Sequence, residues 1–221
     1  MANLHPGILF DLDGTLVDTN YLHTLAWSRA LRDAGEWAPM NAIHRLVGMG
    51  GDQLVPELLG HSCDAAKERR SVRYKEIMDD ARALPGAGDL LRRCHDAGLK
   101  VVLASSAPSD ELDALRRLLD ADEAVDATTT ADDVEASKPA PDVFVTAMRA
   151  GGIDPGRALA VGDSVWDVRA ARAAGVACVA VETGGFSHHE LSEAGALHVY
   201  RSVGELLQQF RTSPLAALAG A

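Results

Sequence analysis

The sequence predicts an α/β fold: a doubly wound, Rossmann-like parallel sheet core that carries an inserted, small all-helical cap domain. Five short apolar runs, each bounded by polar or glycine residues, have the length and character of strands that are buried on both faces. Helical patterns separate most of these runs, and this alternation is typical of a parallel sheet with helices on both faces. One long interval after the first run has helical periodicity and no convincing strand, which predicts a separate helical domain.

The expected strands and helices have recognisable ends. We expect strands at residues 8–12, 100–105, 125–128, 158–163 and 176–182. The helix expected at 88–97 stops at Gly98, and the helix expected at 167–174 stops at Gly175. Glycine is common at these positions because it readily takes the left-handed conformation that ends a helix.

Two serines are expected to begin helices in the second half of the chain. Ser109 precedes acidic residues and is expected to cap a helix over 109–119. Ser187, with Glu190 three residues later, predicts a capping box. The adjacent histidines at 188–189 are not expected to bind a metal, because neighbouring side chains diverge in a helix and no third ligand has suitable spacing.

The helical interval divides the expected core into two segments. We expect residues 18–83 to form the cap domain and residues 1–17 and 84–212 to form the catalytic core. Leu-Pro-Gly at 84–86 is a plausible hinge between them, because proline ends a helix and glycine relaxes the turn. The small, apolar segment 213–221 is expected to be a frayed C-terminal tail, with a short packed helix as the alternative.

Composition limits the classes of function. The chain has 221 residues, of which 47% are hydrophobic, which is ample for a buried core. Its 21 basic and 32 acidic residues give a formal net charge of −11, which disfavours nucleic acid and anionic membranes as partners. The three cysteines show neither disulfide nor metal spacing, and no apolar stretch is long enough to span a membrane. We therefore expect a cytoplasmic protein, monomeric or homodimeric, that acts on a small molecule.

Polar groups suited to phosphate chemistry follow several of the expected strands. They are Asp11 and Asp13, Ser105 and Ser106, Lys138 on a loop before a helix, and Asp163 with Asp167. The carboxyl ends of parallel strands meet in one crevice, so these groups are expected to converge. Three clustered carboxylates repel one another unless a cation lies among them, and oxygen ligands favour Mg²⁺. The pattern predicts a magnesium site, although an aspartate or serine at a strand end can also be an ordinary turn or cap residue.

Four segments resemble the motifs of the haloacid dehalogenase superfamily, in the same order and with the same spacing. They are Asp-Leu-Asp-Gly-Thr-Leu-Val-Asp-Thr at 11–19, Leu-Ala-Ser-Ser at 103–106, Ser-Lys-Pro-Ala-Pro-Asp at 137–142 and Gly-Asp-Ser-Val-Trp-Asp at 162–167. The resemblance covers residues 7–210. The helical insert directly after the first motif indicates the branch that contains phosphoglycolate phosphatase-like and β-phosphoglucomutase-like proteins.

The resemblance implies a role for each matched residue. Asp11 would attack phosphorus and form an aspartyl-phosphate, while Lys138 offsets the repulsion between the two anions. Asp13 would protonate the leaving oxygen and then activate water. For the metal, Asp11 and Asp163 would provide side-chain ligands, Asp13 its backbone carbonyl, and Asp167 a second-shell or water-mediated contact.

The phosphoryl group would be held by hydroxyl and backbone donors. Ser105 would donate its hydroxyl, and backbone N–H groups near Gly14 and at Ser106 would complete the cradle. Together with Lys138, these groups imply a Mg²⁺-dependent phosphatase acting on phosphoglycolate or a sugar phosphate.

Two alternatives remain open at this point. A β-phosphoglucomutase-like phosphosugar mutase gains support from His23 and Trp27, which resemble cap-entry residues of that enzyme. It loses support at Gly162, where the mutases place an additional acidic ligand, and in the glycine-rich segment 48–54, which lacks the mutase arginine. A non-catalytic metabolite-binding protein is less favoured, because every catalytic position is filled. Carbon–halogen cleavage is disfavoured by the presence of Asp13 and Asp163.

Substrate selection is expected to reside in the cap, because the core motifs grip only the phosphoryl group and the metal. The candidates are His23, His44, Arg45, Gln53 and the segment 48–51 that contains Gly50. A histidine on a helix can equally be a packing residue, and an arginine a solvated surface charge. Repeated glycines could let backbone amides approach a ligand, or could simply form a turn.

Overall fold

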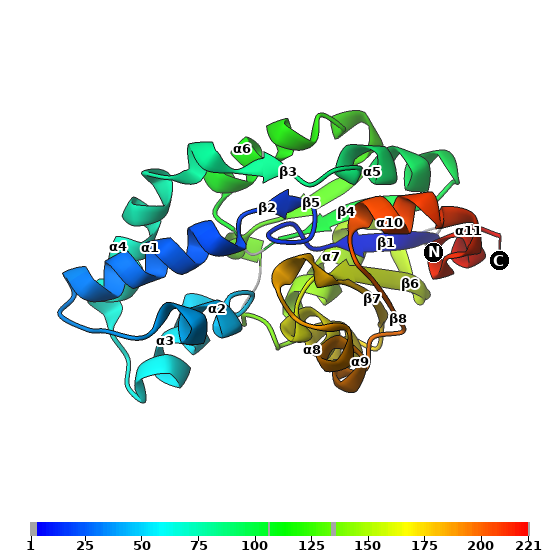
Figure 1. Cartoon of the computed structure of the whole chain (residues 1–221). Helices are drawn as coiled ribbons and strands as arrows, with labels where there is room; N and C mark the ends of the chain where they lie inside the picture. Colours follow the sequence, from blue (N-terminus) through cyan, green and yellow to red (C-terminus); the bar gives the residue numbers. More distant parts are fainter. Residues whose placement is uncertain (1–3, 106, 134–135, 221) are drawn as a thin grey trace. The chain divides into compact units, whose positions relative to one another are not determined.

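The computed structural model describes residues 4–105, 107–133 and 136–220 (Figure 1). The chain divides into two compact units, of which one combines Met1–Val17 with Ala83–Ala221 and the other is Asp18–Arg82. The two-residue strands β2 (Val17–Asp18) and β3 (Arg82–Ala83) pair with each other where the chain passes between the units. We call the first unit the core unit and the second the cap unit.

The core unit is built on a six-stranded sheet in the order β5-β4-β1-β6-β7-β8, and every pairing is parallel. Its strands are β1 (His5–Phe10), β4 (Lys100–Ala104), β5 (Ala127–Thr129), β6 (Ile153–Gly162), β7 (Ala177–Val181) and β8 (His198–Tyr200). After β1 the chain builds β4 and β5 on one side and then β6, β7 and β8 on the other. This reversal beside β1 is the kind of switch point at which open parallel sheets bind ligands.

Helices connect and cover these strands. They are α5 (Ala87–Asp96), α6 (Ser109–Leu119), α7 (Asp142–Gly151), α8 (Val165–Ala173), α9 (His188–Ala194), α10 (Val203–Gln208) and α11 (Pro214–Ala219). Short 3₁₀ turns also occur, namely η2 (Asp122–Ala124), η3 (Ala131–Asp133), η4 (Glu182–Gly184) and η5 (Phe210–Thr212). Phe144 of α7, Val168 of α8 and Leu191 of α9 are buried in one hydrophobic cluster with Leu9 and Ala160 of the sheet. The predicted doubly wound α/β fold is confirmed.

The cap unit is helical and has its own apolar core. It contains α1 (Asn20–Asp33), α2 (Met40–Leu46), α3 (Gly51–Leu59), α4 (Asp64–Lys75) and the 3₁₀ turn η1 (Met78–Asp80). Trp27 and Leu31 of α1 pack with Ile43 of α2, Leu54 of α3 and Ala66 of α4. The helices are short and depend on this shared core, because isolated helices of such length are marginal in water.

Two details of the core unit differ from the sequence-based expectations, and a third confirms one of them. Ser109 does not cap α6: Pro108 occupies the N-cap position and makes no side-chain cap hydrogen bond. Strand β8 was not expected, because it has only three residues and the first of them, His198, is exposed. The expected capping box of α9 is confirmed, with Glu190 N–H donating to the Ser187 hydroxyl.

The C-terminal segment is the clearest difference, because residues 214–219 form a packed helix instead of a frayed tail. Ser213 caps α11 through a hydrogen bond from the Ala216 N–H, and Pro214 occupies the first turn, where its missing N–H costs nothing. Leu215 is fully buried, and α11 lies beside β1 (Figure 1). Burial of the Leu215 side chain stabilises this small apolar helix against the core unit.

Helices capable of crossing a lipid bilayer were not found in the described part of the chain.

Candidate active site

The loop after β1 begins the site. Phe10 pairs with Leu103 of β4 and with Val161 of β6, so Asp11 follows the sheet where both neighbouring strands end. The Asp11 N–H donates to the Val161 carbonyl, and Gly14 has a φ of 79°, a conformation that favours glycine. The chain then turns back, as the Val17 N–H donates to the Leu12 carbonyl at 3.0 Å. This turn holds the Asp11 backbone rigidly at the switch point of the sheet.

Three carboxylates meet at this point. Asp11 follows β1, Asp163 follows β6, and Asp167 lies in the first turn of α8. Each offers an oxygen, and the three oxygens lie within 4.8 Å of one another. The three side chains are only 7%, 3% and 1% exposed, respectively. The sequence placed these residues in one cluster, and the structure brings them together.

Lys138 supplies the positive charge of the cluster. Its ammonium group donates to Asp11 Oδ1 and forms an ion pair of 2.7 Å with Asp167 Oδ1. The group also lies over the Phe144 ring, 5.6 Å from the centroid. Burial alone would lower the pKa of Lys138, but Asp11 and Asp167 outweigh that effect and raise its pKa above the ordinary value. Lys138 therefore remains charged at every physiological pH.

The negative charge of Asp11 is disfavoured in this site in spite of the contact with Lys138. Burial, followed by the charge of Asp167, raises the pKa of Asp11 to about 7, although Lys138 acts in the opposite direction. Asp13, half-buried on the same loop, adds a smaller contribution of the same sign as Asp167. The metal-free site thus holds more negative charge than its own lysine can neutralise.

The donor set fits a divalent cation. If Asp11, Asp163 and Asp167 are ionised, their three negative charges and the one positive charge of Lys138 leave −2, which a divalent ion would balance. All the available ligand atoms are oxygens, which favour Mg²⁺ or Ca²⁺ over softer metals. A cation among the three carboxylates would lower the pKa of Asp11, which burial and Asp167 raise in the metal-free site.

Asp167 has two functions, one for each oxygen. Its Oδ2 accepts from the N–H and the hydroxyl of Ser164, at 3.1 and 2.5 Å, in the capping box that starts α8. Its Oδ1 faces Lys138. The helix-capping interpretation of Asp167 and its predicted contact with the catalytic cluster are therefore compatible. The capping box fixes the carboxylate so that one oxygen is always presented to Lys138.

The phosphate-binding residues expected on the second strand are described in part. Ser105 is buried directly after β4, where its hydroxyl oxygen accepts from the Ala107 N–H at 3.0 Å. Its carbonyl accepts from the Thr129 hydroxyl at 3.2 Å. The hydroxyl hydrogen of Ser105 can still be donated to a ligand. Ser106 lies outside the described residues.

Thr15 is a site residue to which the sequence analysis assigned no role. Its hydroxyl lies 2.9 Å from Asp11 Oδ2 and 3.1 Å from Asp163 Oδ1, and the side chain is fully buried. A hydroxyl has one hydrogen, so it donates to one carboxylate at a time and keeps both within reach. The signal was present, because Thr15 belongs to the first motif, but only the fold shows that it joins Asp11 to Asp163.

The turn after β7 also supports the cluster and was not identified from the sequence. The Thr183 hydroxyl donates to the Gly14 carbonyl at 2.6 Å, which ties η4 to the loop of Asp11. A Cβ atom at Gly184 would lie 2.0 Å from Asp163 Oδ2, and one at Gly162 would lie 2.4 Å from the Asp167 Cβ. Only glycine fits at these two positions, because the backbone there passes too close to an aspartate side chain to leave room for a Cβ atom.

The substrate residues predicted in the cap unit occupy three of its helices. His23 is buried on α1, its Nδ1 accepts from the Arg70 guanidinium at 2.7 Å, and its ring stacks on Tyr74 with centroids 4.3 Å apart. His44 on α2 stacks on Tyr21, and burial lowers its pKa. Arg45 is exposed on α2, and Gln53 is half-buried on α3. His23 and His44 thus have packing partners within the cap unit itself.

The glycine-rich segment of the cap has structural reasons for its composition. Gly48 has a φ of 100°, and Gly50 is the N-cap residue of α3. A Cβ atom at Gly51 would lie 2.8 Å from the Trp27 ring. The turn interpretation accounts for Gly48, and close packing against Trp27 accounts for Gly51. A ligand contact at Gly50 stays a prediction.

Comparison with known proteins agrees with the site. The model of the haloacid dehalogenase-like hydrolase family matches residues 5–175. Protein CbbY of Cereibacter sphaeroides is 31% identical over 215 residues, covering 90% of this chain and 93% of that protein. Phosphoglycolate phosphatase of Pseudomonas putida is 30% identical over 192 residues, covering 82% and 70%. The chloroplastic protein SUPPRESSOR OF QUENCHING 1 of Arabidopsis thaliana is 32% identical over 213 residues, and the match spans 90% of this chain but only 20% of that protein.

Solved structures show the same relationship. A hydrolase from Pseudomonas syringae is 33% identical with a TM-score of 0.87, covering 94% of this chain and 98% of that one. CbbY from Rhodobacter sphaeroides, solved as a mutant in complex with xylulose-(1,5)bisphosphate, is 28% identical with a TM-score of 0.75, covering 92% and 96%. The chain is an enzyme of the haloacid dehalogenase-like hydrolase family.

Proposed function

We propose that this enzyme is a Mg²⁺-dependent phosphatase that hydrolyses a small phosphorylated metabolite through an aspartyl-phosphate on Asp11. The observation that carries the proposal is the buried cluster in which Asp11 contacts Lys138 and Thr15 beside two further carboxylates. A carboxylate so crowded by negative charge is a good nucleophile only when a cation shares the site. The cytoplasm, with its reduced thiols and abundant Mg²⁺, is the compartment we propose.

Two chemical steps follow from this arrangement. In the first, an Asp11 oxygen attacks phosphorus, the ester P–O bond breaks, and Asp13 gives its proton to the leaving oxygen. In the second, Asp13 takes a proton from water as the water oxygen attacks phosphorus, which releases phosphate and restores Asp11. Lys138 stays charged and offsets the charge of the phosphoryl oxygens throughout.

The metal would be held by Asp11, Asp163 and the Asp13 carbonyl, and Asp167 would contact it through water. When bound, Mg²⁺ supplies charge that lets the anionic carboxylate approach an anionic phosphate. Ser105 and the backbone around Gly14 would hold the phosphoryl oxygens. Thr15 and Thr183 support these groups and do not themselves react.

The substrate class is proposed from the relatives. One is named a phosphoglycolate phosphatase, and CbbY was solved with xylulose-(1,5)bisphosphate. We propose phosphoglycolate or a sugar phosphate, selected by cap residues that include His23, Arg45, Gly50 and Gln53. The phosphosugar mutase is disfavoured by Gly162, because even a methyl group there would collide with Asp167.

The proposal is tested by measuring phosphate release from phosphoglycolate and a panel of sugar phosphates, with Mg²⁺ and with a chelator. We expect release that requires Mg²⁺ and disappears in Asp11→Asn. Asp113→Asn, which alters an exposed aspartate of α6, is the matched control and should keep full activity. Undiminished release in Asp11→Asn or in chelator would refute the mechanism.

Two further outcomes separate the alternatives. Conversion of β-glucose 1-phosphate to glucose 6-phosphate without net phosphate release would identify a mutase. Saturable binding of phosphorylated metabolites without any turnover would identify a binding protein. Either result would replace the phosphatase proposal.

A further inference from the structure

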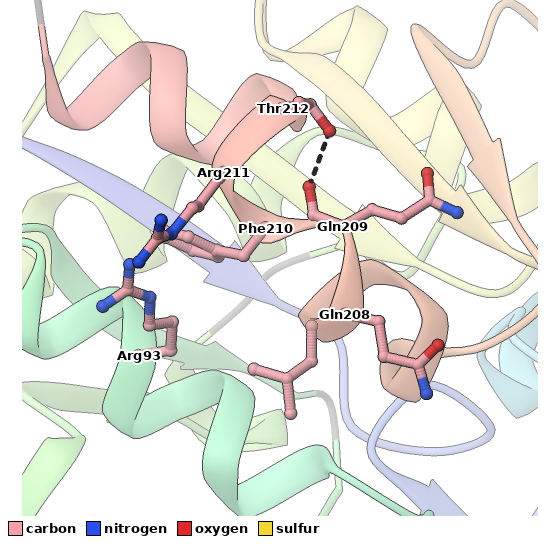
Figure 2. Close-up of a pocket in the computed structure, with 7 residues that line it drawn as sticks. Arg93, Gln208, Gln209, Phe210, Arg211 and Thr212 are labelled. Carbon is pink, nitrogen blue, oxygen red and sulfur yellow. Dashed lines mark hydrogen bonds between the residues drawn. The ribbon is translucent and has the colours of Figure 1, made fainter.

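A hollow lies in the core unit, between α5, the end of α10 and the segment that follows it (Figure 2). It has a volume of about 330 Å³, at the lower end of the range of small-molecule sites. The residues that line it are Arg93, Leu207, Gln208, Gln209, Phe210, Arg211 and Thr212. Arg93 lies in the last turn of α5, shortly before β4 begins, whereas the aspartates of the candidate active site follow the ends of strands. The hollow is therefore at the opposite end of the sheet from the carboxylate cluster.

The hollow gathers positive charge around an apolar surface. The Arg93 guanidinium lies over the Phe210 ring, 4.8 Å from its centroid, and Phe210 itself is only 4% exposed. The Arg211 guanidinium points toward that of Arg93 (Figure 2). None of the lining residues is acidic. Leu207 contributes a second apolar side chain beside Phe210.

Neither of these arginines has an anionic partner among the described residues. Arg92, the residue before Arg93, pairs with Glu123 at 2.6 Å, and Arg116 pairs with Asp122 at 2.9 Å. Within residues 4–105, 107–133 and 136–220, no ion pair or hydrogen bond joins the guanidinium group of Arg93 or of Arg211 to a carboxylate or a carbonyl.

Two guanidiniums that face each other can bind one anion between them, and both Arg93 and Arg211 are exposed and so accessible to a ligand from solution. Each guanidinium has five N–H donors in a planar fork that matches the oxygens of a carboxylate or phosphate group. Like charges that face each other repel, and an anion between them turns this repulsion into attraction. Stacking on Phe210 holds the Arg93 fork in place before a ligand arrives, which reduces the entropy lost on binding.

We propose that this hollow is a binding site for a small organic phosphate or phosphonate, separate from the active site. Arg93 and Arg211 would bind its anionic group, and Phe210 and Leu207 would contact its apolar body. The proposal depends only on the core unit and does not require the phosphatase activity to be correct.

The test measures binding of phenylphosphonate by titration calorimetry at low ionic strength, in chelator. The probe has an anionic group and an apolar ring, and its carbon–phosphorus bond is not a phosphate ester. Without metal, the three clustered carboxylates outnumber the one lysine beside them and disfavour anions, so the signal reports the hollow beside Arg93. We expect saturable binding with one site per chain, weakened about tenfold or more in Arg93→Gln and in Arg211→Gln. Arg117→Gln, at an exposed arginine of α6, is the matched control and should bind normally.

Several results would overturn the proposal. Absence of saturable binding would refute the site, and unchanged affinity in the double variant Arg93→Gln, Arg211→Gln would place the probe elsewhere. Equal affinity for inorganic phosphate and phenylphosphonate would refute the role of Phe210 and Leu207. Phosphate release with Mg²⁺ is measured on the same variants. Loss of binding with normal release would support a separate site, whereas loss of both together would refute the separation of the two sites.

Discussion

Replacing Asp11, the proposed nucleophile, should stabilise the metal-free protein even though we expect it to abolish turnover. Asp11 is buried, and its surroundings raise its pKa from 3.8 to about 7. A raised carboxyl pKa means that ionisation of the carboxyl destabilises the folded protein. The stabilisation that comes with the neutral carboxyl is complete below the pKa of the unfolded chain, and it is lost as the pH rises through the pKa of the folded protein. The difference between the two pKa values of Asp11 corresponds to a loss of about 4 kcal/mol in the free energy of unfolding once Asp11 is fully ionised. Asp11→Asn removes this cost and leaves Lys138 paired with Asp167.

The assay is urea unfolding of wild type and Asp11→Asn between pH 4 and pH 8, in chelator. At pH 4 we expect the two stabilities to be similar, and at pH 8 we expect the variant to be more stable by up to about 4 kcal/mol. The exposed-site variant Asp113→Asn should show no such pH-dependent gain. Added Mg²⁺ should stabilise wild type more than Asp11→Asn and shrink the difference, since a ligand stabilises the state that binds it.

The reasoning would be refuted if Asp11→Asn were equal to or less stable than wild type at pH 8 in chelator. That result would mean that Asp11 contributes favourable ion pairing to the metal-free fold and that Lys138 alone satisfies the cluster. A gain of the same size at pH 4 and pH 8 would also refute it, because the cost is tied to ionisation.

Three further substitutions probe the groups around Asp11. Lys138→Met should lower the free energy of unfolding of the metal-free protein by about 3–5 kcal/mol at pH 7, because it leaves buried carboxylates without their counter-charge. Chemical denaturation would measure this loss, and a change below about 1 kcal/mol would contradict the prediction. Thr15→Val keeps the shape but removes the hydroxyl between Asp11 and Asp163, and should weaken Mg²⁺ activation of phosphate release, whereas Thr15→Ser should restore it. Gly184→Ala places a methyl group against Asp163 and should reduce phosphate release by about tenfold or more. The control Gly156→Ala, where the nearest atom is 3.4 Å from the added Cβ, should change the release little. Equal activity of these two alanine variants would show that the site tolerates displacement of Asp163.

The strands of the core could be predicted from the sequence because their apolar runs are local and continuous. Their hydrophobic character alone explains why the sheet was expected around β1, β4, β6 and β7. The three-residue strand β8 has too short a run to be recognised, and it forms because β7 offers it an open edge. The helix α11 was expected only as the alternative to a frayed tail for a related reason: its stability depends on the burial of Leu215, which no local pattern reports.

The same distinction applies to the candidate site. By itself the sequence determined which residues could perform the chemistry: Asp11, Asp13, Lys138 and Asp163 follow strands or lie on loops, in the order of a known family. Only the tertiary structure decided how they are connected. Lys138 meets Asp11 across 127 residues, and Thr15 lies beside Asp163 across 148.

Those contacts depend on the order β4-β1-β6-β7, in which strands distant in sequence become neighbours. Local hydrophobic periodicity reports which residues are buried but not which strands pair. The bridging role of Thr15, the second contact of Lys138 and the close approach of Gly184 to Asp163 therefore become visible only when the sheet is assembled.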